Sequence, residues 1–147
     1  MSISGHWRSA MMANASKDPI WLAKVSSEVK RNPALKKVIE SKCATCHMPM
    51  ARFTTAESGG TAQVFAAIGE PLSMDGVSCT VCHQMKPDNL GEPESFDGGF
   101  LVDKTTPQGQ RRIYGPHDIA AGHQQIMRSA SRFVPPPRRS SSSPRKG

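Results

Sequence analysis

The chain has 147 residues, of which 37% are hydrophobic and only 5% aromatic. A chain of this length normally buries roughly two thirds of its unfolded surface, and this one has few large apolar residues to bury, which favours an apolar cofactor in the interior. No apolar run approaches the roughly 18 residues of a membrane span, and no recognisable nucleic-acid-binding motif is present.

The net charge of +7 is mostly a property of the C-terminal end. Residues 138–147 contain four Lys or Arg and no acidic residue, so the rest of the chain holds 15 basic against 12 acidic residues. Residues 135–147 are rich in Pro, Ser and Arg, a composition that cannot pack into a core. The sequence therefore predicts one domain over residues 1–134 and a disordered basic tail over 135–147.

The first predicted helix begins at Asp18 and Pro19, because Asp can cap a helix and Pro suits its first position. Its apolar residues recur at helical spacing, and they are Trp21, Leu22, Val25 and Val29. Asn32-Pro33 ends this helix and starts a second one, which runs toward Cys43. The apolar stripe of the second helix is Leu35, Val38 and Ile39.

Beyond Met48-Pro49-Met50, which breaks the second helix, the elements are shorter. A short helix is expected over residues 62–68, and Asp75-Gly76 leads into another helical turn. Residues 100–102 and 112–114 are expected to pair as a small β-hairpin, and residues 118–132 to form a last helix. The predicted fold class is mainly α, with short helices and long loops and one small β-hairpin.

All four cysteines fall into two CxxCH motifs, Cys43-Ala-Thr-Cys46-His47 and Cys79-Thr-Val-Cys82-His83. This motif is typical of c-type haem attachment. Two thiols three residues apart lie on one side of a helical turn and can bond the two vinyl groups of one porphyrin, and the adjacent His then ligates the iron. Since five of the 147 residues are His, both CxxC units would be followed by His by chance in roughly 0.1% of cases.

Two other uses of paired cysteines remain open at this point. A Cys₄ zinc site usually has its pairs about 15–20 residues apart, whereas Cys46 and Cys79 are separated by 32 residues, and zinc leaves both His residues unexplained. Structural disulfides are a further alternative in an exported protein. Haem attachment is favoured because it accounts for all six residues.

Each iron also needs a sixth ligand or an open position. The remaining histidines are the candidate distal ligands, namely His6, His117 and His123. Methionine sulfur is the alternative, and it would raise the haem potential relative to a second His. The methionines near the motifs or in plausible loops are Met48, Met50, Met74, Met85 and Met127, although core packing is the more common role of Met.

Several stretches of the chain, spread over about residues 4 to 134, resemble bacterial multihaem cytochromes c, most closely the group related to the tetrahaem cytochrome of nitrifying bacteria. They are Ser4-Gly-His6-Trp-Arg-Ser-Ala-Met-Met12, Asp18-Pro-Ile-Trp21, Cys43-Ala-Thr-Cys-His-Met-Pro49 and Asp75-Gly-Val-Ser-Cys-Thr-Val-Cys-His-Gln84. In that family a Ser-x-His element after a first CxxCH supplies a distal ligand, which the resemblance places at Ser4 and His6.

The resemblance also implies that further CxxCH motifs lie on both sides of this sequence. The family's first motif would precede Met1. Later motifs usually follow a stretch like residues 126–135, but at that point this sequence gives way to Pro, Arg and Ser. We therefore expect the chain to be an internal fragment, whose neighbouring haem domains and export signal belong to a longer parent protein. A fragment without a function of its own is one of the alternatives.

Electron transfer through two haem c groups is the expected function, with redox partner proteins as partners, no nucleic acid and no membrane span. One alternative is a multihaem oxidoreductase that converts a small nitrogen compound at an open iron site, and another is a zinc-binding CxxC module. No acid–base pair supports catalysis, so an electron carrier is favoured over an enzyme. Because c-type haem is attached outside the cytoplasm, a periplasmic or otherwise exported location is expected.

Overall fold

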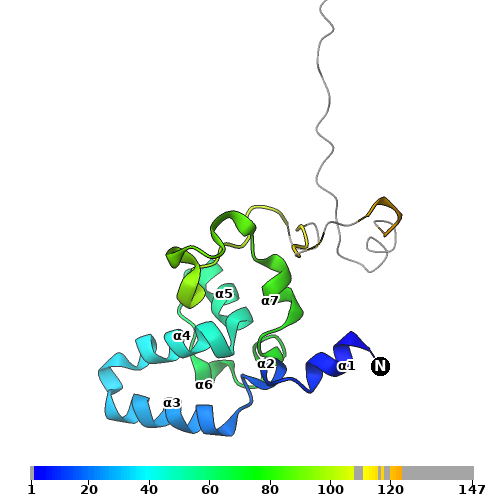
Figure 1. Ribbon diagram of the computed structural model, residues 1–147. Coiled ribbons are helices and arrows are strands. Elements are labelled where there is room, and N and C mark those ends of the chain that lie inside the picture. Colours follow the sequence, from blue (N-terminus) through cyan, green and yellow to red (C-terminus); the bar gives the residue numbers. More distant parts are fainter. Residues whose placement is uncertain (1, 108–110, 116, 118–119, 124–147) are drawn as a thin grey trace, which may run out of the picture.

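A computed structural model describes residues 2–107, 111–115, 117 and 120–123. Short helices joined by loops account for most of this part of the chain (Figure 1). Among the described residues, no helix is both long and apolar enough to cross a membrane. The α-helices are α1 (Ile3–Arg8), α2 (Met11–Asn14), α3 (Pro19–Arg31), α4 (Lys36–His47), α5 (Pro49–Glu57), α6 (Val64–Ala67) and α7 (Cys79–Gln84).

The first predicted helix is confirmed as α3. The Asp18 carboxylate accepts hydrogen bonds from the amides of Ile20 at 2.8 Å and Trp21 at 3.4 Å, so it caps the helix as expected. The helix ends at Arg31, before Asn32, and the 3₁₀ helix η1 (Pro33–Leu35) leads into α4. Figure 1 shows α3 and α4 lying side by side, with α5 continuing the chain beyond α4.

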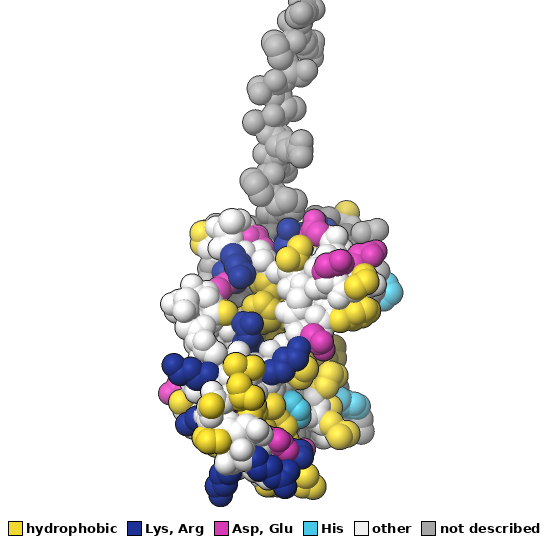
Figure 2. Space-filling view, turned by 90° about the vertical axis from the view of Figure 1, so that its left-hand side faces the viewer, with side chains coloured by type: hydrophobic (Ala, Val, Ile, Leu, Met, Phe, Trp, Pro, Cys, Tyr) yellow, Lys and Arg dark blue, Asp and Glu magenta, His cyan; other side chains and the backbone are white. Residues whose placement is uncertain are grey.

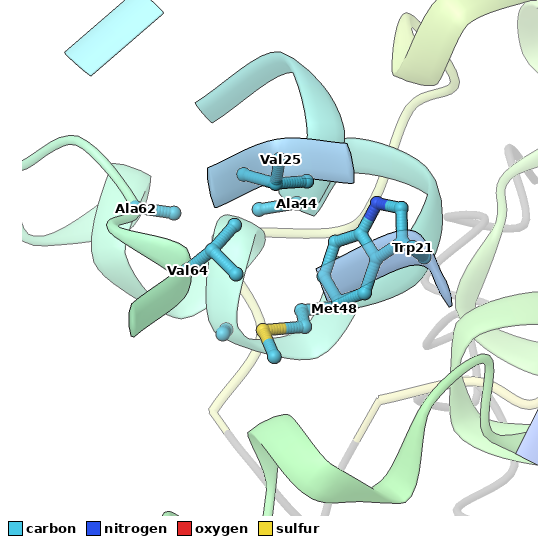
Figure 3. Close-up of a cluster of buried hydrophobic side chains, with 7 residues drawn as sticks. Trp21, Val25, Ala44, Met48, Ala62 and Val64 are labelled. Atoms are coloured by element: carbon cyan, nitrogen blue, oxygen red, sulfur yellow. The ribbon is translucent and has the colours of Figure 1, made fainter. Parts of the chain in front are cut away.

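The hydrophobic core lies where α3, α4, α5 and α6 meet (Figure 3). It is made of small residues together with one indole and one thioether, and its members are Trp21, Val25, Ala44, Met48, Ala51, Ala62 and Val64. Met48 is completely buried, so it fills this core as an ordinary apolar side chain. The core is small for the length of the chain, which agrees with the composition.

The N-terminal segment packs against the loop that precedes α7. The Trp7 Nε1–H donates to the Val77 carbonyl at 3.1 Å, and the Val77 amide donates to the Met12 carbonyl at 2.9 Å. Gly76 allows this approach, since its φ is +61° and a Cβ there would lie 2.5 Å from the Met12 carbonyl oxygen. Residues before α3 therefore position the second CxxCH motif.

The expected hairpin between residues 100–102 and 112–114 is wrong. Both segments instead pair with the end of α7: Val102 forms an antiparallel bridge with Met85, and the Tyr114 amide donates to the His83 carbonyl at 2.8 Å. Backbone groups at the end of α7 take up the hydrogen-bond partners that a hairpin between these two segments would need. The pattern of apolar residues did not reveal this.

Two predictions concern parts of the chain that the structure describes little or not at all. Of the predicted helix over residues 118–132, only residues 120–123 are described, and 121–123 are helical. The predicted tail over 135–147, and with it the domain boundary at residue 134, lies outside the described residues.

Candidate haem-attachment sites

The first CxxCH motif forms the last turn of α4. Cys43 is half-buried and Cys46 exposed, and both are free thiols. The pKa of the Cys43 thiol is raised, mainly by burial and further by the neighbouring Cys46 and Glu40. A raised pKa keeps this cysteine in the protonated form, so it does not behave as a reactive thiolate.

His47 at the end of this motif is held on two sides. Its Nδ1 lies 2.9 Å from the Ala15 carbonyl oxygen, and its ring stacks on the Trp21 indole with centroids 4.3 Å apart and planes 4° from parallel. A carbonyl oxygen can only accept, so Nδ1 carries the proton and donates it. Nε2 is then the unprotonated nitrogen, which is the one a neutral His uses to bind a metal.

The second motif forms α7 and repeats this arrangement. The His83 Nδ1–H donates to the Tyr114 carbonyl at 2.6 Å, which again leaves Nε2 as the nitrogen available for iron. Its surroundings differ, because His83, Cys79 and Cys82 are all exposed. The carbonyl partners of the two histidines, Ala15 and Tyr114, were not predicted, since any residue can supply a backbone carbonyl.

A cavity of about 510 Å³ lies between α5 and α7. This volume falls in the range of roughly 300–1,000 Å³ found for cofactor and ligand sites. Cys79 and His83 of the second motif lie in its wall, and Phe53 and Phe100, whose ring centroids are 4.8 Å apart, form another part of it. The full lining is Met50, Phe53, Thr54, Glu57, Leu72, Cys79, Thr80, Val81, His83, Gln84, Phe100, Val102, Arg111 and Ile113.

This cavity fits a haem bound through the second motif. Its wall is largely apolar and aromatic, as a porphyrin requires, and it contains a cysteine and the histidine of one CxxCH unit. Arg111 lies at the same wall, 4.0 Å from the Glu57 carboxylate, where a cation can meet a haem propionate. The helix over Pro49–Glu57 was not predicted, although Met50, Phe53 and Glu57 recur at the i, i+3, i+7 spacing of one side of a helix.

The candidate distal ligands are not brought to this cavity. His6, His117 and His123 are all exposed, and none belongs to the cavity lining. Among the methionines weighed from the sequence, Met50 lines the cavity, whereas Met48 is buried in the core and Met74 packs against that core. Met127 lies outside the described residues.

The geometry does not assemble a zinc site. Within the described part of the chain, no three His, Cys, Asp or Glu side chains come together as a metal-binding group. The two cysteine pairs belong to separate helices, α4 and α7, and each pair is followed by a histidine oriented through Nδ1. The fold and these two sites define a cytochrome of the c type, in which short helices carry covalently attached haem.

Comparison with known proteins agrees with that class. The family model described as cytochrome c554 and c-prime matches residues 2–84, a range that covers more than half of the chain. The chain belongs to this family, and it is a bacterial multihaem cytochrome c. It transfers electrons through covalently bound haem c, and members of such families are typically exported. Neither the curated proteins nor the solved structures gave a match in the comparisons.

Proposed function

We propose that this chain carries two haem c groups and passes electrons between them and a redox partner protein. One haem is attached to Cys43 and Cys46 with His47 as its proximal ligand. The other is attached to Cys79 and Cys82 with His83 in the same role. The haems supply the reversible iron chemistry, and the protein sets their spacing, orientation and surroundings.

The observation that carries this proposal is the shared orientation of the two histidines. Each donates Nδ1–H to a backbone carbonyl more than thirty residues away in sequence, at 2.9 Å for His47 and 2.6 Å for His83. Such partners fix the tautomer and the ring plane of metal-binding histidines. Two unrelated surface histidines have no physical reason to share this arrangement.

The two sites are expected to differ in their surroundings. His47 is half-buried and stacked on Trp21, whereas His83 is exposed beside an open cavity. Burial and hydrogen bonding to the ligands are among the factors that set haem potentials. We therefore propose two potentials, which would give electron flow a direction. The distal ligands remain proposals, with His6, His117 and His123 as candidates alongside Met50 at the second site.

Haem counting tests the proposal directly. The chain is produced in a host that attaches c-type haem in its periplasm, and the haem per chain is measured by mass and by absorbance of the pyridine complex. Two haems are expected for the natural sequence, one for the Cys43→Ser/Cys46→Ser variant and one for Cys79→Ser/Cys82→Ser. A natural chain that carries one haem, or zinc instead of haem, would contradict the assignment.

A second candidate function rests on the cavity beside His83. Because His83 is the only histidine in the described lining of this cavity, an iron ligated by His83 could keep an open position opposite it. Such an iron could react with a small nitrogen compound, with Arg111 attracting an anion. Carbon monoxide added to the reduced protein separates the alternatives. An altered spectrum supports an open site, and an unchanged spectrum shows that both haems are six-coordinate and act only as carriers.

A further inference from the structure

A second hollow lies against α4, and one of its lining residues, Thr45, belongs to the first CxxCH motif. Its volume is about 410 Å³, and we call it the basic hollow, lined by Lys37, Val38, Ser41, Lys42, Thr45, Arg52, Thr61 and Asp97. Three of these side chains are cationic and one is anionic. The Asp97 carboxylate lies 3.4 Å from the Lys42 amino group, so the hollow keeps an excess of positive charge.

Arg52, in the lining of this hollow, has one hydrogen-bond donor without a partner among the described residues. This donor is its Nε, which is buried. Buried donors on charged groups are normally paired, since leaving one unpaired costs free energy. The planar guanidinium matches a carboxylate in shape and charge, so the part of Arg52 that lines the hollow is suited to pair with a carboxylate.

Charge is unevenly divided along the chain, and the basic hollow lies in the positive part. Residues 24–52 contain seven Lys or Arg but only two acidic residues, Glu28 and Glu40, and Glu40 is completely buried. Residues 53–103 contain eight acidic residues and a single basic one, Lys86. In the lower half of Figure 2, which holds α3 and α4, dark-blue Lys and Arg side chains surround yellow hydrophobic ones.

Apolar side chains are exposed beside these cations. Val38, in the lining of the hollow, is 65% exposed, and Leu35, one helical turn earlier, is 53% exposed. An apolar centre within a charged rim is the usual composition of a protein-binding surface. A small anion alone would gain nothing from Val38 and Leu35, so these two residues favour a protein as the occupant.

We propose that the basic hollow is the docking site of an acidic redox partner protein, with a carboxylate side chain of the partner pairing with Arg52 and Lys37. This inference rests on the proposed haem at Cys43 and Cys46. Lys42 of the hollow directly precedes Cys43, so a partner docked there lies against the helix that carries this haem. Complementary charge mainly speeds the encounter, which suits the small, transient interfaces of electron-transfer partners.

The test uses the haem-loaded protein and a synthetic peptide of ten glutamates as the acidic probe, with binding measured by calorimetry at low salt. The variant Lys37→Gln/Lys42→Gln/Arg52→Gln removes the three cationic side chains of the basic hollow and leaves Asp97. The control Lys17→Gln/Lys24→Gln/Lys30→Gln makes the same change in net charge at exposed positions outside it. We expect the first to weaken binding by about tenfold or more, and the control by less than about threefold, since isolated exposed pairs contribute little.

Three outcomes would overturn the proposal. Equal weakening in both variants would mean that the probe senses net charge alone. Binding of inorganic phosphate in the basic hollow without binding of the peptide would indicate a small-ion site. Self-association of the natural chain that the first variant abolishes would make a second copy the occupant. Haem content is read from the same samples by absorbance, so a failure of haem attachment is seen separately from a failure of docking.

Discussion

Replacing Trp21 by Ala is expected to destabilise the protein severely and to release His47. Trp21 is only 9% exposed and belongs to the hydrophobic core. Removing a buried Trp side chain costs about 3–5 kcal/mol, and the parallel ring pair with His47 adds about 0.5–1.5 kcal/mol to what is lost. The whole free energy of unfolding of a small domain is about 5–15 kcal/mol, so this single change removes a large share of it.

The assay is denaturant unfolding of the haem-loaded protein, followed by helix content and by haem absorbance together. Trp21→Phe keeps an aromatic ring against His47 and is expected to lose less stability than Trp21→Ala. Trp7→Phe is the matched control, because Trp7 is only half-buried and loses one Nε1–H hydrogen bond to Val77. Such a bond contributes about 0.5–1.5 kcal/mol.

One result would refute the reasoning about Trp21. If Trp21→Ala unfolds within about 1 kcal/mol of the natural protein and its haem spectrum is unchanged, neither the core nor the ring pair holds His47 in place. A loss of stability with both haem spectra unchanged would keep the packing argument and remove the link to His47.

Three further changes test other features. Gly76→Ala is expected to cost at least about 1–3 kcal/mol in denaturant unfolding, because it adds backbone strain to a clash with the Met12 carbonyl. Gly91→Ala, with φ of +92° and open space around it, suffers the strain alone, so equal losses in the two variants would contradict the close approach of Gly76 to Met12. Hydrogen bonds from Thr106 and then Thr105 lower the pKa of Asp103 below its ordinary 3.8. The ionised carboxylate therefore stabilises this turn above about pH 4, and the turn loses that support as the pH falls further. Asp103→Asn should remove this acid dependence from amide exchange at Thr106. Glu40→Leu is expected to leave the unfolding free energy unchanged or raise it by about 1–4 kcal/mol. Among the described residues, the buried Glu40 carboxylate has only the Lys36 amino group near it, at 3.7 Å, so a clear loss of stability would show that it has another partner.

The sequence predicted the elements that depend on local signals. Asp18 with Pro19, and Asn32 with Pro33, delimit α3 as expected, because capping and the missing amide of Pro act within a few residues. The two CxxCH motifs were also identifiable from the sequence, because their spacing matches the spacing that haem attachment requires.

The features that sequence reasoning missed depend on distant parts of the chain. Residues 100–102 and 112–114 each pair with the end of α7 instead of with one another. The carbonyls of Ala15 and Tyr114, which orient the two histidines, carry no side-chain signal. The α5 wall of the cavity has helical spacing, but nothing in that spacing indicates what it faces.

The two histidine–carbonyl hydrogen bonds have a consequence for how the chain folds. The first joins residues 15 and 47, which are 32 residues apart in sequence, and the second joins residues 83 and 114, which are 31 apart. The two loops that these bonds close do not overlap. The entropy of closing a loop depends on its length, so the two closures cost nearly the same and neither requires the other. We therefore expect each of these histidines to gain its orientation in a separate step.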